Sequence, residues 1–295
     1  MKNPSPIKFL CAFSVLCGAF IACLSTDALA STQKIGPDLY AYISENDASA
    51  NSTFLVSEKG ILVVDTGLNA QEGRKLLEEI RKVSAAPVRW IVNTHYHPDH
   101  RGGNGVVGPE ALVISTAFTR TQAGSTAAGY ALNETVGAKG LTLYVGIYEV
   151  QIYAPGRAHT MGDLLVYFPD QHAMATGDLF LTNSCPAMDK GDLENWIAAL
   201  NQVIFMPVDH VVPGHFALAG KKELTHFRDY LAQLRKQVGR MYRNGSSLEE
   251  VKKSISLTDF ADMRQFPQYE ATFADNAAAY YHQLEERKAP RRAAP

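Results

Sequence analysis

The spacing of apolar residues predicts short strands in the first part of the chain, followed by a change to helix. Residues 39–43, 53–57 and 61–65 each carry apolar side chains in a strand-like pattern. The turn at residues 58–60, Glu-Lys-Gly, joins the last two into a predicted hairpin. Beyond it, apolar residues recur at helical spacing among Glu and Lys residues, which predicts an amphipathic helix over residues 70–82.

Strands and helices continue to alternate toward the C-terminus. Further strands are predicted over residues 88–93, 112–115, 141–143, 148–153, 164–168, 173–176 and 210–212. Further helices are predicted over residues 193–204, 221–241, 248–255 and 269–287. Many short strands with helices between them predict an α/β fold with sheet packed on sheet and helices outside. We expect one domain over residues 31–245, with residues 246–295 as a helical extension packed on the same domain.

The first thirty residues have the three-part pattern of a signal peptide. Lys2 and Lys8 precede an apolar run over residues 9–24, and the segment closes with Ala28-Leu29-Ala30. The run is short for crossing about 30 Å of hydrocarbon, and small residues in this arrangement are typical of a cleavage site. We therefore expect cleavage after Ala30 and a periplasmic or secreted protein.

A lipoprotein is the alternative form of export. Residues 20–23, Phe-Ile-Ala-Cys, loosely resemble a bacterial lipoprotein box, in which Cys23 would carry the lipid. Phe20 stands where such boxes usually have Leu, which disfavours this alternative.

Composition and charge exclude several classes of protein. The chain has 295 residues, of which 46% are hydrophobic and 20% charged, an ordinary globular composition. It holds 28 basic and 30 acidic residues; removing residues 1–30 leaves 26 and 29, a formal charge of −3. A chain so near neutrality has no electrostatic basis for binding nucleic acid or an anionic membrane. The expected partner is a small-molecule substrate, with no integral membrane segment after signal cleavage, and the sequence sets no oligomeric state.

Cysteine usage adds a constraint on stability. Cys11, Cys17 and Cys23 all lie in the signal segment, so only Cys185 remains in the mature chain. An internal disulfide is then impossible, and we expect stability to come from the core and from bound metal. Cys185 lies in the loop over residues 181–193, where we interpret it as a passive thiol that can line the mouth of a site.

The strongest chemical signal is the hexapeptide His-Tyr-His-Pro-Asp-His at residues 95–100. Imidazole nitrogen and carboxylate oxygen bind zinc at about 2.0 to 2.2 Å, so several such groups must meet at one point. In an extended segment residues two apart face the same way, which lets His95 and His97 hold one ion. Asp99 and His100 follow where the chain turns, so they can address a second ion.

Position along the chain strengthens this signal, because the histidines directly follow a predicted strand. Ligand sites in α/β sheets lie at the carboxyl ends of strands. Three later strands are followed in the same way by His159, Asp178 and His215. The remaining histidines, at positions 172, 210, 226 and 282, are interpreted as ordinary surface or core residues.

Five motifs together resemble the metallo-β-lactamase superfamily over residues 35–241. They are Asp-Thr-Gly at 65–67, Thr-His-Tyr-His-Pro-Asp-His at 94–100, His159, Gly-Asp-Leu-Phe at 177–180 and Pro-Gly-His at 213–215. The resemblance implies a four-layer αββα sandwich, here with extra C-terminal helices. It implies one zinc ion held by His95, His97 and His159, a second held by Asp99, His100 and His215, and Asp178 bridging both. Iron or manganese is the alternative metal, and Asp65 in such proteins is a structural residue beneath the metals.

The same resemblance implies a hydrolytic mechanism. Two zinc ions about 3.5 to 4 Å apart acidify a shared water, which then attacks a carbonyl as a bridging hydroxide. Asp99 is the expected catalytic residue, orienting the hydroxide and passing a proton to the leaving group. The expected reaction is cleavage of an ester-like or amide-like bond in a thioester, lactone or β-lactam.

Departures from the family pattern narrow the class. Asp178 stands where many true β-lactamases of this fold have Cys or Ser, and looks more like glyoxalase II and related thioesterases and lactonases. His97 stands where flavo-diiron proteins have Glu. An iron-dependent oxygenase similar to persulfide dioxygenases and a metal-stabilised accessory protein of a periplasmic oxidoreductase remain open. Substrate choice rests on the loops over residues 46–52, 116–139 and 181–193.

Overall fold

The computed structural model describes residues 31–124, 133–188, 190–264 and 269–288. The predicted signal peptide, residues 1–30, lies outside the described residues, and so does part of the 116–139 loop. Within the described ranges no helix has the length and apolar character needed to cross a membrane.

Seven strands form the first sheet, in the order in which they occur along the chain. They are β1 (Ser31–Lys34), β2 (Leu39–Ile43), β3 (Ser52–Ser57), β4 (Gly60–Val64), β5 (Val88–Val92), β6 (Leu112–Ser115) and β7 (Asn133–Thr135). Strands β1 to β4 pair antiparallel, which includes the predicted hairpin of β3 and β4, and β4 to β7 pair parallel. The parallel half carries the histidine-rich hexapeptide beyond the end of β5.

Five strands form the second sheet, in the order β12-β11-β10-β9-β8. They are β8 (Leu141–Val145), β9 (Tyr148–Gly156), β10 (Asp163–Phe168), β11 (Ala173–Gly177) and β12 (His210–Pro213). Only β11 and β12 pair parallel; β8 to β11 alternate in direction. Strands β9, β11 and β12 therefore run the same way and end at the same edge.

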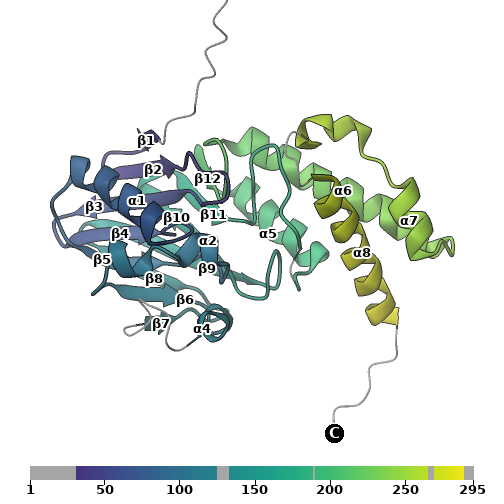
Figure 1. Cartoon of the computed structure of the whole chain (residues 1–295), viewed down its shortest axis with the longest axis horizontal. Helices are drawn as coiled ribbons and strands as arrows, with labels where there is room; N and C mark the ends of the chain where they lie inside the picture. Colours follow the sequence, from purple (N-terminus) through teal and green to yellow (C-terminus); the bar gives the residue numbers. More distant parts are fainter. Residues whose placement is uncertain (1–30, 125–132, 189, 265–268, 289–295) are drawn as a thin grey trace, which may run out of the picture.

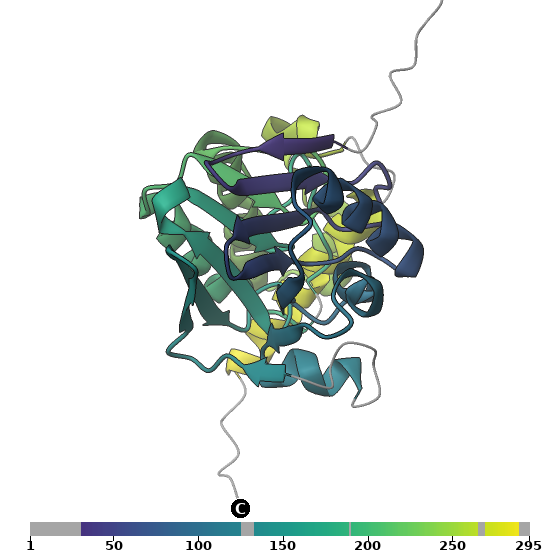
Figure 2. The same ribbon diagram turned by 90° about the vertical axis from the view of Figure 1, so that its left-hand side faces the viewer.

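The two sheets pack face to face through the side chains at alternate positions of their strands. Leu55 and Leu62 of the first sheet share a buried cluster with Val166 and Phe168 of the second. The alternate residues of the first sheet, such as Phe54, face outward against helix α1 (Ala70–Val83). In Figure 2 the purple strands of the first sheet and the teal strands of the second form adjacent layers.

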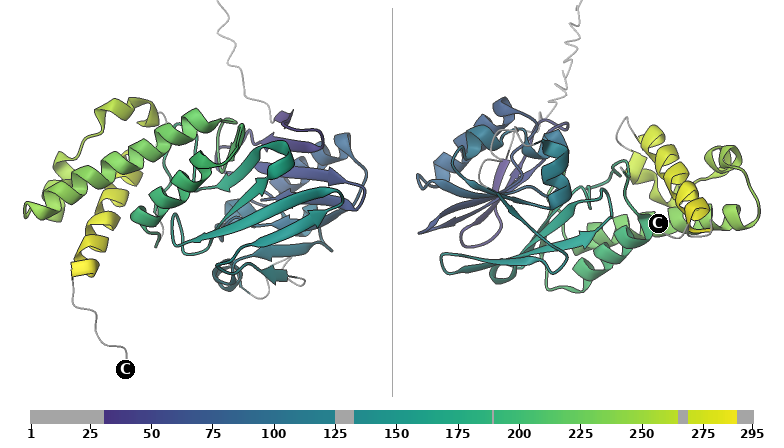
Figure 3. Two further views of the ribbon diagram at one scale, coloured as in Figure 1. Left: turned by 180° about the vertical axis from the view of Figure 1, so that it is seen from behind. Right: turned by 90° about the horizontal axis from the view of Figure 1, so that it is seen from below.

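Helices cover the outer face of the second sheet as well. Helices α5 (Leu193–Phe205) and α6 (Lys221–Arg243) pack on it with the largest buried cluster of the described chain, which includes Trp196 and Phe227. Figures 1 and 3 show α1 on one side of the molecule and α5 and α6 on the other. The predicted four-layer αββα sandwich is confirmed.

Most predicted elements are present, and those missed are short. Strands β1 and β7 and the helices α2 (Pro98–Arg101), α3 (Asn104–Val107) and α4 (Ala117–Ala123) were not predicted. β1 has the polar sequence Ser-Thr-Gln-Lys and forms an edge of its sheet, so it carries no hydrophobic pattern. Helices of one or two turns likewise show too few periods to be recognised.

Two helices and a 3₁₀ segment follow the sandwich. They are α7 (Leu248–Ser254), η2 (Thr258–Arg264) and α8 (Tyr269–Lys288), and α8 packs against α6, α7 and η2. Figure 1 shows α8 in yellow crossing α6. The division into a domain over residues 31–245 and an extension over residues 246–295 stays a prediction.

One face of α8 holds the backbone of the loop that follows Asp178. The amide of Asn276, 1% exposed, accepts from the Met188 N–H at 2.7 Å and donates to the Pro186 carbonyl at 3.0 Å. About two turns further along the helix, Gln283 donates to the Gly191 carbonyl at 3.0 Å and accepts from the Leu193 N–H. α8 is therefore a support for this loop.

We predict that Asn276→Ala lowers the free energy of unfolding by about 1 to 3 kcal/mol, because it leaves buried backbone groups of the loop without partners. Chemical denaturation measures the change. The matched control on the same helix is His282→Ala, which removes an exposed ion pair with Glu285 and should change stability by less than about 0.5 kcal/mol. Equal denaturation midpoints for both variants would contradict the supporting role of Asn276.

Candidate metal centre

The seven predicted metal-binding residues come together at one edge of the sandwich. His95 lies beyond the end of β5, and His159, Asp178 and His215 lie beyond the ends of β9, β11 and β12. His97 precedes α2, the short helix that contains Asp99 and His100. Parallel strand ends meet at one edge of a sheet, which explains why segments far apart in the sequence meet here.

The side chains form two groups that share one carboxylate. The first consists of His95, His97, His159 and Asp178, and the second consists of Asp99, His100, Asp178 and His215. In each group the potential ligand atoms all lie within 4.8 Å of one another. Asp178 therefore has the bridging position that the sequence resemblance implies, while the ligand roles themselves stay predictions.

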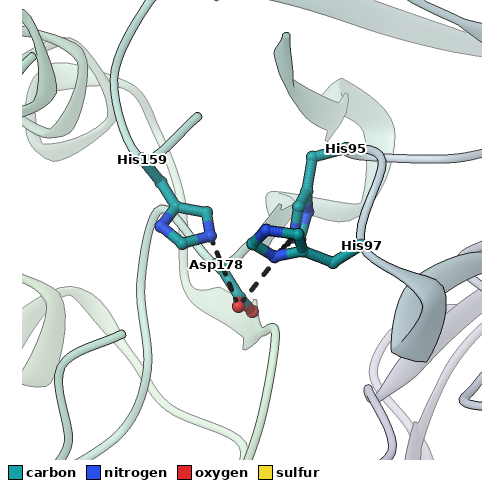
Figure 4. Close-up of side chains that lie close together, drawn as sticks. All are labelled: His95, His97, His159 and Asp178. Atoms are coloured by element: carbon teal, nitrogen blue, oxygen red, sulfur yellow. Dashed lines mark hydrogen bonds and ion pairs between the residues drawn. The ribbon is translucent and has the colours of Figure 1, made fainter. Parts of the chain in front are cut away.

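In the first group three imidazoles face one oxygen of Asp178 (Figure 4). The Nε2 atoms of His159 and His95 lie 3.7 and 4.0 Å from Asp178 Oδ2. His97 Nδ1 lies 2.9 Å from His95 Nε2. The donors thus converge on a space between the rings.

In the second group two imidazoles lie between two carboxylates. His100 Nε2 is 3.2 Å from Asp178 Oδ1 and 3.4 Å from Asp99 Oδ2. His215 Nε2 is 3.1 Å from Asp99 Oδ2 and 3.6 Å from Asp178 Oδ1. The two oxygens of Asp178 thus face different groups.

The donor atoms fit a divalent transition metal. Both ring nitrogens of His159 are buried and make no hydrogen bond to any described residue. A buried polar atom without a partner costs about 1 to 3 kcal/mol, which a ligand at that atom would offset. Nitrogen and carboxylate oxygen are also the donors that zinc prefers, and they suit iron and manganese.

Burial keeps the first group of histidines neutral. Desolvation lowers the pKa of His95 and His97 and lowers the pKa of His159 to about 3. A neutral imidazole is the form that binds a metal ion. Desolvation opposes ionisation of Asp178 as well, but the neighbouring charges of His100 and His215 hold its pKa well below the usual range. The first group therefore presents neutral nitrogens and an ionised oxygen ligand.

Hydrogen bonds behind the ligands fix their orientation. Asp65 Oδ2 lies 2.7 Å from His100 Nδ1 and accepts from the Thr94 hydroxyl, while Oδ1 accepts from the Thr94 N–H. On the other side His215 Nδ1 is 3.0 Å from the carbonyl oxygen of Asp47. Such contacts leave Nε2 of each ring for a ligand. Asp65 occupies the structural position beneath the site that the resemblance implies.

Close backbone packing also constrains the site. A Cβ on Gly214 would lie 2.0 Å from Asp178 Oδ1. Gly177, which precedes Asp178, has a φ of +50°, and a Cβ there would meet the Thr94 side chain. The glycines of the two motifs thus let β11 and β12 bring Asp178 and His215 together.

Two supporting residues were missed at the level of sequence. Asp163 is buried and accepts from the backbone N–H and hydroxyl of Thr160, so it holds the loop that carries His159. The fully buried Trp196 lies with its ring 5.6 Å from the His159 ring and donates to the Leu179 carbonyl. The position of Asp163 four residues after His159, at the start of a strand, was the available signal.

The remaining histidines for which the structure gives a partner lie outside the cluster. His172, His226 and His282 each pair with a surface carboxylate, as their interpretation as ordinary residues predicts. Cys185 is buried, its thiol donates to the Pro186 carbonyl, and burial raises its pKa. A thiol in that state is a poor nucleophile.

A cleft of about 590 Å³ opens beside the second group. Its walls come from the turn after β2, the loop after Asp178 and the first turns of α8. The lining residues are Glu45, Asn46, Asp47, Ala48, Asp178, Leu181, Ser184, Cys185, Pro186, His215, Phe216 and Thr272.

A family model described as the metallo-beta-lactamase superfamily matches residues 46–111 and 119–215, more than half of the chain and all seven cluster residues. The chain belongs to the metallo-β-lactamase superfamily. At the level of this superfamily it is a metal-dependent hydrolase, and its His and Asp cluster is a possible site for a divalent metal.

Individual members of the superfamily are only distantly similar. The metallo-beta-lactamase type 2 of Elizabethkingia meningoseptica is 26% identical over 217 residues, covering 68% of this chain and 84% of that protein. The type 2 enzyme of Bacillus cereus is 25% identical over 198 residues, covering 64% and 76%. These values support the superfamily and leave the substrate open.

Solved structures confirm the fold. A metallo-beta-lactamase from Pontibacter korlensis has a TM-score of 0.60 at 23% identity, covering 69% of this chain and 99% of that chain. A stereoselective inverting sec-alkylsulfatase from Pseudomonas sp. has a TM-score of 0.72 at 17% identity, covering 87% of this chain and 50% of that chain. Proteins named for different activities thus share the fold of this chain.

The buried carboxyl of Asp163 generates a prediction about pH. Desolvation raises its pKa from 3.8 to about 7, so the folded protein holds a proton there that the unfolded chain releases at lower pH. This contribution to stability is present below pH 3.8 and is lost as the pH rises toward about 7. The difference of about three units between the pKa values of Asp163 in the folded and unfolded chain corresponds to at most about 4 kcal/mol in the free energy of unfolding.

We predict that Asp163→Asn, which cannot ionise there, loses less stability than the unmodified protein between pH 4 and pH 8. Thermal unfolding of both proteins without metal, over that range, measures the difference. If the stabilities of the two proteins changed equally with pH over this range, the raised pKa of Asp163 would be contradicted.

Proposed function

We propose that the chain is an exported zinc hydrolase that binds two metal ions and cleaves an ester-like or amide-like bond. The single observation that carries the proposal is the shared carboxylate of Asp178, whose two oxygens face two separate groups of donors. His95, His97 and His159 would hold one ion and Asp99, His100 and His215 the other. When bound, two divalent ions supply Lewis acidity that makes water nucleophilic near neutral pH and polarises a carbonyl.

The chain's own residues supply orientation and exclusion of bulk water. His95, His159 and Asp178 are buried, and His97 is only partly buried. Asp99 is partly exposed, and although desolvation opposes its ionisation, His100 and His215 keep its pKa well below the usual range. It is therefore a carboxylate that can accept a hydrogen bond from the attacking water, and it can then pass the proton to the leaving group.

Thioesters, lactones and β-lactams are the proposed substrates. The cleft of about 590 Å³ beside Asp178 and His215 has the size of a site for a small molecule. An iron-dependent oxygenase stays the alternative, because the same donors suit iron. Metal analysis, oxygen uptake and hydrolysis measured on one sample of mature protein separate the two.

Export is part of the proposal and rests on the sequence of residues 1–30. The expected mature protein begins at Ser31. Fractionation of producing cells and N-terminal sequencing test this, and a protein found only in the cytoplasm with residues 1–30 retained would exclude it.

We predict that His97→Ala loses metal from the first group and hydrolysis together. Substitution of residues that only support a ligand costs about 10- to 100-fold in metal affinity or activity, and loss of a ligand should cost at least that much. Metal content and initial rates on the same preparation measure both. His226→Ala is the control, since its partly exposed ring pairs with Asp262, and retained turnover in His97→Ala would refute the ligand assignment.

Removal of metal should lower the melting temperature, because the ligands follow four separate strands and an ion ties them together. Melting curves recorded with and without a chelator measure the effect. The shift should be absent when chelator saturated with zinc is added instead, and a melting temperature indifferent to chelation would argue against a metal shared by these strands.

A further inference from the structure

We propose that the cleft beside Asp178 and His215 binds the part of the substrate that lies beyond the scissile bond. This cleft favours substrates in which that part is cationic over uncharged ones, and uncharged ones over those that carry a carboxylate. The inference rests on the proposed hydrolysis and adds the class of substrate.

The cleft has an inner end and an outer rim of different character. Asp178 and His215, which belong to the second donor group, form the inner end. The outer rim is the turn after β2, where Glu45 and Asp47 are exposed. A substrate whose scissile carbonyl lies at the inner end must place the rest of the molecule toward this rim.

The rim is acidic. Glu45 and Asp47 both line the cleft, and among its described lining residues there is no Lys or Arg. Glu45 is partly neutralised, since Lys75 Nζ lies 2.9 Å from it and also bonds Glu72. Asp47 has no such cation in the described chain within ion-pair distance, so its charge acts most strongly on a bound group.

The other residues that line the cleft also favour a cationic group. Leu181, Pro186 and the ring of Phe216 give the cleft apolar surface. An aromatic face attracts a cation, and an aromatic ring beside a carboxylate suits a quaternary ammonium group. A carboxylate placed at the outer rim would face the like charges of Glu45 and Asp47, which raises its free energy there.

The turn that carries Asp47 is held by hydrogen bonds that do not involve the Asp47 side chain. This side chain can therefore be substituted without removing those bonds. The Asp47 carbonyl oxygen contacts His215 Nδ1. The Asn46 side chain accepts from the Ala48 N–H, and the Asn46 carbonyl accepts from the Ser49 N–H. None of these bonds uses the Asp47 carboxylate.

Three thioacetates with the same scissile bond test the proposal on the zinc-loaded protein. S-acetylthiocholine carries a trimethylammonium group, S-butyl thioacetate is uncharged, and S-acetyl-3-mercaptopropionate carries a carboxylate. We expect kcat/KM to fall in that order by about three- to tenfold per step, the range for single charges a few ångströms apart in a partly hydrated cleft. High salt should compress the differences.

Charge variants assign the selectivity to the rim. Asp47→Asn should narrow the spread among the three substrates by about threefold, and Asp47→Lys should bring the carboxylate substrate ahead of the cationic one. The matched control is Glu110→Lys, which makes the same change in net charge at an exposed residue that does not line the cleft. It should preserve the order of the substrates.

The outcomes separate this inference from the proposed function. Preference for the carboxylate substrate, or an order that Asp47→Lys leaves unchanged, would overturn the inference while hydrolysis stands. Absence of turnover with all three substrates and with lactones and β-lactams would overturn the hydrolase proposal. In that case, calorimetry can measure the affinities of three thioethers that carry a methyl group in place of the acetyl group and so have no thioester bond to cleave. The order of these affinities still tests the predicted preference for a cationic group.

Discussion

The structure depends on one arrangement, the meeting of buried imidazoles from distant segments around the carboxylate of Asp178. Histidine rings in a protein interior repel one another when charged and leave polar atoms without partners when neutral. Burial keeps His95 and His159 neutral, and both ring nitrogens of His159 make no hydrogen bond to any described residue. Asp65, Asp163 and Trp196 then hold the rings in position. Such a collection of groups is consistent with a protein whose folded state is completed by an ion.

The sandwich and the convergence of the seven cluster residues could be predicted from sequence because both follow from local patterns. A period of two marked the strands, and glycine-flanked Asp178 and His215 directly after apolar strands marked their ends. The hexapeptide at residues 95–100 has four side chains of metal-ligand type within six residues. These signals require no knowledge of how the sheets face each other.

The remaining features come from contacts between segments far apart in the sequence. Nothing near Asn276 indicates that its amide reaches the backbone of residues 186 and 188, because an isolated Asn on a helix looks like a surface residue. The residues around Trp196 in the sequence likewise do not indicate that its ring is fully buried beside the ring of His159. The acidic rim depends on where the turn carrying Asp47 meets the loop after Asp178, and the alternation of apolar residues contains no information about that meeting.

The way α8 holds the loop after Asp178 has an evolutionary consequence. Asn276 and Gln283 bond chiefly to main-chain atoms, which every amino acid possesses. Side chains such as Leu181 and Ser184 can therefore be exchanged by mutation while the loop keeps its anchor. A scaffold of this kind lets new substrate preferences arise by single replacements, without first sacrificing the fold that carries the reaction.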